Sequence, residues 1–189
     1  MRALLIVAAT VLAGAAGAVW LAAAAGAGGD PWQQAKAATA RYHSLEQAEK
    51  AGYAYAGEPC VAEAAGAMGV HAVDQALVGD PALDPLRPEI LLYLPDGNGG
   101  LKLVGAEYFQ VALVATPEGP RPWFGQDDPR EQGFAFVGPV PALLGQTFDG
   151  PMAGHNPSMP WHYDLHAWLW AENPSGRFTP FNPALSCRS

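Results

Sequence analysis

The sequence contains few positively charged residues and no run of them. Its 189 residues include 10 Lys and Arg against 18 Asp and Glu, so the formal net charge is −8. Nucleic acids and anionic lipid surfaces attract proteins through clustered Lys and Arg. We therefore expect no nucleic-acid partner and no binding to a lipid surface, and a small molecule is the class of partner that stays open.

Several motifs of common enzyme classes are also missing. The chain has no CxxC pair, no glycine-rich phosphate loop, no GxSxG turn and no internal repeat. Nucleotide binding through a phosphate loop needs the glycine-rich loop, and serine hydrolases of the α/β type need the GxSxG turn that carries the nucleophile. The sequence therefore argues against both classes.

Cysteine occurs only twice, as Cys60 and Cys187. An even cysteine count in an exported chain predicts a disulfide, and a bridge between these two would close a long loop worth about 4–5 kcal/mol in the chain-entropy view. Two free thiols or a cysteine metal ligand are the alternatives. A disulfide between Cys60 and Cys187 is the prediction.

The N-terminal segment is apolar and precedes everything that looks globular. Ala3 to Ala25 carries no charge, and Ala25-Gly26-Ala27 has the small-x-small pattern of a signal-peptidase site. We expect a signal peptide at 1–27 and one domain at 28–189, secreted or otherwise extracytoplasmic. The alternative is an uncleaved anchor, because the apolar run reaches the length of about 20 residues that crosses a bilayer.

Two patterns predict the regular structure of this domain. Asp30-Pro31 has the chemistry of a helix start, helical spacing of apolar residues follows, and Gly52 suits the helix end. A hairpin is predicted from strand 89–93, the turn 95–100 and strand 101–115, whereas 116–160 is rich in Pro and Gly and reads as a long loop. Along the second strand one face would hold Leu103, Gly105, Glu107, Phe109, Val111 and Leu113, so Glu107 is a carboxylate in an apolar row. The fold class is therefore α+β, with the N-terminal helix packed on an antiparallel sheet that can close as a barrel.

The stretch 161–170 concentrates histidines and tryptophans and is predicted to be a strand. Side chains alternate along a strand, so His162, Asp164, His166, Trp168 and Trp170 would share one face. A helix is the alternative, and it would bring the two histidines within one turn of each other. Three polar side chains among aromatic ones require partners if they are buried.

A metal site would satisfy several of these polar groups together. The candidate ligands are His71, Glu107, His162, Asp164 and His166, with Glu89 as a residue behind them, and this donor set suits Zn, Mn, Fe or Ni. His162 and His166 would be about 13 Å apart along a straight strand, so only one of them can share an ion with His71 and Glu107. The sequence favours His162 as that ligand, with Asp164 or His166 completing or orienting the set.

Two metal-free interpretations stand beside this one. His162 and Asp164 can form a hydrogen-bonded pair that only holds the fold, or the polar groups can form an acid–base site without an ion. Three functions follow: a small exported metal-dependent enzyme, a non-catalytic metal-binding or small-ligand-binding protein, and a structural or interaction module.

The motifs resemble a family of exported bacterial proteins of uncharacterised activity. The residues that carry the resemblance are Met68-Gly69-Val70-His71, Pro88 to Tyr93 (PEILLY), Val104 to Tyr108 (VGAEY), His162 to Trp170 (HYDLHAWLW), Asn173 to Phe178 (NPSGRF) and Asn182-Pro183. A weaker similarity links parts of these motifs to the plant oil-body-associated protein family. That family has a second histidine where this chain has Asp164, so a shared site would be altered.

Overall fold

The computed structural model describes residues 29–55, 57 and 59–188, so the expected signal peptide at 1–27 lies outside the described residues. No helix in the described part of the chain is long and apolar enough to cross a membrane. The helices are α1 (Pro31–Thr39), η1 (Ala40–His43), α2 (Leu45–Lys50), α3 (Gln75–Val78) and η2 (Pro129–Gln132). The strands are β1 (Val61–Glu63), β2 (Gly66–Val73), β3 (Ile90–Pro95), β4 (Leu101–Val111), β5 (Leu113–Val114), β6 (Arg121–Pro122), β7 (Ala142–Leu143), β8 (Gln146–Thr147), β9 (Asp149–Met152) and β10 (His162–Ala167).

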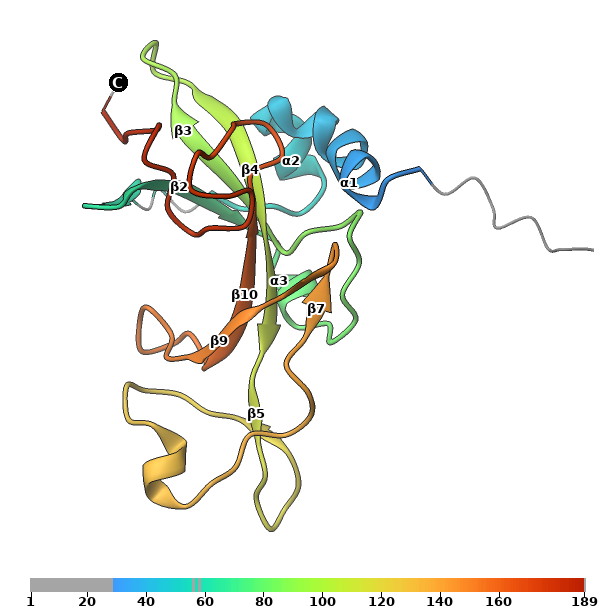
Figure 1. The fold of residues 1–189 in the computed structure, drawn as a ribbon, viewed down its shortest axis with the longest axis vertical. Coiled ribbons are helices and arrows are strands. Elements are labelled where there is room, and N and C mark those ends of the chain that lie inside the picture. Colours follow the sequence, from blue (N-terminus) through green and yellow to red (C-terminus); the bar gives the residue numbers. More distant parts are fainter. Residues whose placement is uncertain (1–28, 56, 58, 189) are drawn as a thin grey trace, which may run out of the picture.

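One antiparallel sheet organises the domain. Among the described residues, six strands form it in the order β1-β2-β3-β4-β10-β9, and it curls into a half-barrel (Figure 1). The predicted α+β class and the hairpin of β3 and β4 are confirmed. The second strand of that hairpin is shorter than expected, because β4 ends at Val111 and the chain continues into the separate β5.

The prediction of one continuous helix between Asp30 and Gly52 is wrong, because this range contains two α-helices separated by a 3₁₀ turn. The first helix begins as predicted, since the Asp30 carboxylate accepts a hydrogen bond from the Trp32 N–H and Pro31 is the first helical residue. A 3₁₀ turn then interrupts it, and the hydroxyl of Ser44 caps a new helix by accepting from the Gln47 N–H. A strong capping residue in mid-pattern thus starts a second helix.

Apolar side chains cover both faces of the sheet. On one face, here called the helical face, Tyr108 and Leu165 belong to an apolar cluster that includes Ala35 of α1. On the opposite face, here called the cavity face, Phe109 and Trp168 belong to another cluster. The predicted face of β4 is therefore correct around Glu107.

A bulge changes the facing of side chains at the start of β4. Tyr93 pairs with Leu103 whereas Leu92 pairs with Gly105, so Val104 is an extra residue in the ladder. Leu103 therefore lies in the cluster of Tyr93, away from Glu107, although simple alternation places both on one side. Period-two patterns fail at a bulge because one residue shifts every side chain to the other face.

The strand predicted at 161–170 is confirmed over its first part only. β10 ends at Ala167, and the Trp168 N–H already donates to the Arg177 carbonyl. Trp170, expected on the face of His162, instead donates from its indole N–H to Thr39 Oγ1 at 3.1 Å. The segment 116–160 is also less irregular than expected, because β9 pairs with β10.

The disulfide between Cys60 and Cys187 is confirmed, with 5.7 Å between the two Cα atoms. It joins the residue before β1 to the C-terminal segment, beside the apolar cluster of the cavity face. Gly69 in β2 lies close against the backbone of β3, since its φ is +112° and a Cβ there would lie 2.5 Å from the Tyr93 carbonyl oxygen. The β1–β2 edge of the sheet is thus held by the disulfide and by close packing of the β2 and β3 backbones.

Candidate metal centre

The sheet register brings a carboxylate and an imidazole together on the cavity face. Glu107 of β4 lies directly opposite His166 of β10. Directly opposed residues of an antiparallel pair project to the same face, so the two side chains are neighbours. His71 is on β2, two strands from β4, and reaches the same point because the sheet curls.

The three side chains converge closely. His71 Nε2 lies 3.2 Å from Glu107 Oε2, and His166 Nε2 lies 3.7 Å from the same oxygen. One ligand atom from each of the three residues can be chosen so that all lie within 4.8 Å of one another. This is a two-histidine, one-carboxylate donor set drawn from three different strands.

Burial makes this arrangement energetically demanding. Glu107 is 2% exposed and His166 is 1% exposed. Among the described residues, Glu107 Oε2 and both ring nitrogens of His166 are buried without a hydrogen-bond partner of good geometry. A buried polar atom without a partner costs about 1–3 kcal/mol, and more if it is charged. The cluster therefore needs a cation or shared protons to balance it.

The neighbours of His166 orient its ring. His166 Nδ1 faces Asp164 Oδ1 at 3.8 Å, and the other oxygen, Oδ2, lies 3.9 Å from His162 Nε2. His162 Nδ1 lies 3.1 Å from the Pro160 carbonyl, which can only accept, so this nitrogen is the donor. A His166 tautomer with its proton on Nδ1 would face Asp164 and would leave the lone pair of Nε2 pointing at Glu107, as in carboxylate–histidine–metal arrangements.

The protonation states suit metal ligation. Burial by itself would raise the pKa of Glu107, but His166, His71 and His162 together lower it to about 2, so this group is an anion. Burial lowers the pKa of His166 and of His162, which keeps both rings neutral at pH 7. Burial, with the charge of Glu107, raises the pKa of Asp164 to about 8.

The other residues named from the sequence lie around this centre rather than in it. His162 is fully buried and stacks on Phe109 with 4.6 Å between ring centroids, four residues along β10 from the partner of Glu107. The structure thus brings His71 and Glu107 together at His166 rather than at His162, and Asp164 lies between the two histidines. Glu89 accepts from the backbone N–H of Phe109 at 3.0 Å, and it interacts with Glu107 only through charge.

A cavity of about 300 Å³ opens onto the centre. His71 and Glu107 form part of its wall, and the loop that precedes β10 forms another part. His155, which the sequence pattern did not single out, lines this cavity from that loop, 5.6 Å from the ring of His162. The one signal for it was the Pro/Gly-rich composition of 116–160, which is typical of loops that shape binding sites.

Comparisons with protein-family models, with curated proteins and with solved structures find no match to this chain. The resemblance inferred from the motifs therefore stays a prediction.

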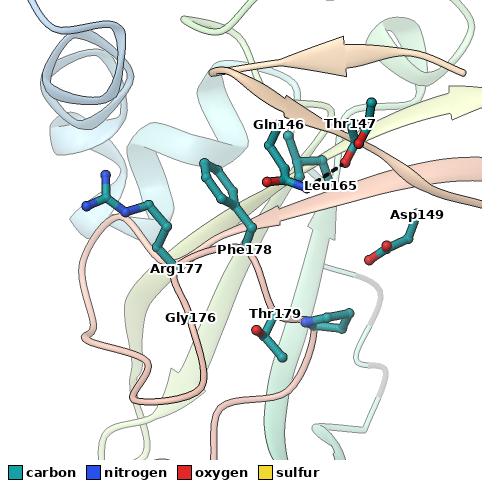
Figure 2. Close-up of a pocket in the computed structure, with 9 residues that line it drawn as sticks. Gln146, Thr147, Asp149, Leu165, Gly176, Arg177, Phe178 and Thr179 are labelled. Atoms are coloured by element: carbon teal, nitrogen blue, oxygen red, sulfur yellow. Dashed lines mark hydrogen bonds between the residues drawn. The ribbon is translucent and has the colours of Figure 1, made fainter.

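A second cavity, of about 430 Å³, lies on the helical face and lacks the features of a reaction centre. Leu165, Phe178 and Asp149 line it, and Figure 2 shows the guanidinium of Arg177 directed away from the side chains of Gln146 and Thr147. None of the buried atoms without a hydrogen-bond partner in the described residues belongs to its lining. The cluster on the cavity face is the stronger candidate.

The distances in that cluster fit a metal ion. Ligands at about 2.1 Å from a tetrahedral ion are about 3.4 Å from one another. The contacts of 3.2 Å and 3.7 Å made by Glu107 bracket this value. The two imidazole nitrogens, within 4.8 Å of each other, need to close by at most about 1.4 Å, which small side-chain rotations supply.

Proposed function

We propose that this protein binds a divalent first-row transition metal through His71, Glu107 and His166, and that it acts with this metal on a small molecule bound in the adjoining cavity. The observation that carries the proposal is the convergence of His71, Glu107 and His166, each with one ligand atom within 4.8 Å of the others. Glu107 Oε2 and His166 Nε2 are also buried without a hydrogen-bond partner of good geometry among the described residues. One cation would satisfy both of these atoms together.

The number of ligands favours a reactive site over a structural one. Structural zinc sites use four protein ligands, whereas catalytic zinc and non-haem iron sites use three and leave a position open. Three converging ligands beside a cavity match the second pattern. Zn²⁺ suits the near-tetrahedral separations best, and it would polarise a bound carbonyl or supply a hydroxide from water near neutral pH.

The disulfide agrees with the expected export of the protein. A disulfide persists in oxidising surroundings such as the periplasm or the extracellular space. The bond between Cys60 and Cys187 therefore supports an extracytoplasmic protein, the localisation that we propose.

Elemental analysis of protein purified without chelators tests the proposal. We expect close to one metal per chain for the parent and a large loss for Glu107→Gln, which keeps the size of the side chain and removes its charge. Glu118→Gln is the matched control, because it makes the same change at an exposed glutamate whose hydrogen bond is with Thr116, outside the cluster. A metal-free parent that also fails to take up Zn²⁺, Fe²⁺, Mn²⁺ or Ni²⁺ would contradict the proposal.

A metal-free acid–base site is the second candidate function. It is favoured by the 3.2 Å contact between His71 Nε2 and Glu107 Oε2, which is close enough for the imidazole to share a proton with the carboxylate. In that case the same elemental analysis gives no metal, and Glu107→Gln changes activity without changing metal content.

A further inference from the structure

The wall of the cavity beside the proposed metal site combines apolar and polar side chains. One part is apolar and is formed by Val73, Val78, Ile90 and Phe109. His71 and Glu107 form the polar part of the wall at the proposed metal site, and the other polar residues, Gln75, His155, Asn156 and Ser158, lie at the exposed rim. A ligand that fills this space therefore meets metal at one end and hydrocarbon along its body.

Charge narrows the class of ligand further. None of the described residues that line the cavity is a Lys or an Arg. A carboxylate or phosphate ligand would bring more oxygens than one open metal position binds, and the remaining oxygens would find no cation to hold them. The net charge of −8 also repels anions from the protein as a whole. A divalent ion with one carboxylate ligand keeps a positive charge, which repels a cationic ligand. This charge attracts an anion only at the open metal position, because no Lys or Arg among the described lining residues adds to it.

The volume of the cavity indicates the size of ligand that it can surround. At about 30 Å³ for each molecule of liquid water, a volume of about 300 Å³ equals about ten waters and holds a ligand of about ten to fifteen non-hydrogen atoms. Larger polymers can present only one end group to this space.

We infer that the cavity takes an uncharged small molecule with an apolar body, which coordinates the metal through a single nitrogen or oxygen atom while the body lies against Val73, Val78, Ile90 and Phe109. The inference rests on the proposed metal site and names the class of ligand that this site accepts.

The test uses the Co²⁺-loaded full chain and its visible absorption bands, which change when a ligand enters the metal's open position. The probes are 1-phenylimidazole (neutral donor with an apolar body), 1-methylimidazole (neutral donor without that body), benzoate (the same phenyl body with an anionic donor) and inorganic phosphate. We expect 1-phenylimidazole to bind about tenfold or more tightly than 1-methylimidazole, because its ring is removed from water. Benzoate and phosphate are expected to bind at least tenfold more weakly than 1-phenylimidazole.

A substitution at the rim provides an independent check. Gln75→Lys adds a cation to the cavity at an exposed position, and Gln75→Met is the matched neutral control. The lysine variant should bind benzoate several-fold more tightly than the parent and leave the affinity for 1-phenylimidazole within about twofold, whereas the methionine variant changes neither.

The outcomes separate the inference from the function on which it rests. If Co²⁺ bands never form, the metal site is wrong and the inference fails with it. If the bands form but benzoate or phosphate binds as tightly as 1-phenylimidazole, or if the phenyl ring adds nothing over the methyl group, the metal site stands and the ligand class is overturned.

Discussion

Two buried histidines on one strand allow a sharp test of the ligand set. His162 and His166 both lie on β10, both face the cavity side, and they are 0% and 1% exposed. Only His166 belongs to the group that can hold a metal. Replacing each in turn by glutamine removes one buried imidazole, so the two variants are controls for each other.

The expected size of the effect follows from binding linkage. A metal present at about one hundred times its Kd stabilises the folded state by about 2.7 kcal/mol, which raises the Tm of a domain of this size by about 5–10 °C. Loss of a direct ligand should weaken metal affinity by more than the 10- to 100-fold that is typical when a residue that only contacts a ligand is replaced. The same metal concentration then stabilises His166→Gln by at most about 0.4 kcal/mol, or about 1 °C.

His162→Gln should keep at least half of the parent shift, because even a tenfold loss of affinity leaves about 1.4 kcal/mol of stabilisation. The assay is thermal unfolding of chelator-stripped protein with and without Zn²⁺, and each variant is compared with its own metal-free form, so that the packing cost of the substitution cancels. A shift that survives in His166→Gln and disappears in His162→Gln would refute the ligand assignment. Equal loss in both variants would refute it as well.

Three further predictions concern the stability of the fold. Burial raises the pKa of Glu89 from about 4.5 to about 7, so the stability contributed by the protonated side chain is complete below pH 4.5 and is lost as the pH rises through 7. In urea unfolding, the free energy of unfolding of Glu89→Gln should therefore rise relative to that of the parent by up to about 3 kcal/mol between pH 4.5 and pH 8. Parallel pH profiles of the two proteins would contradict this. Opening the bridge between Cys60 and Cys187 with a reductant should lower the free energy of unfolding by about 2–5 kcal/mol, whereas peptide mapping that finds both thiols free before reduction would overturn the prediction. Gly69→Ala should cost at least about 1–3 kcal/mol, because its positive φ and the Tyr93 carbonyl leave no room for a Cβ, and an unchanged urea midpoint would refute the close approach.

Much of the fold could be predicted because its signals are local. The helix start at Asp30, the turn of the β3–β4 hairpin and the alternation of β10 each depend on neighbours within a few residues. The parts that were missed depend on distant partners. The strand β9 has no pattern of its own and exists because β10 supplies its hydrogen bonds, and the bulge at Val104 appears only in the pairing of β3 with β4.

The candidate site shows the same division. Sequence alternation correctly placed His162, Asp164 and His166 on one face, and it correctly singled out Glu107 as a carboxylate on an apolar strand face. It could not tell which histidine meets Glu107, because that is decided by the register between β4 and β10, and a shift of four residues in register would have exchanged the two.

The sequence by itself determined the disulfide pairing, the α+β class and the donor types available for a metal, because these follow from composition and from short-range periodicity. Only the tertiary structure decided that His71 reaches Glu107 across the intervening strand β3, that His166 completes the group, and that the loop with His155 forms part of a cavity beside it. The physical reason is that register and sheet curvature arise from contacts between segments far apart in the chain, which no local pattern encodes.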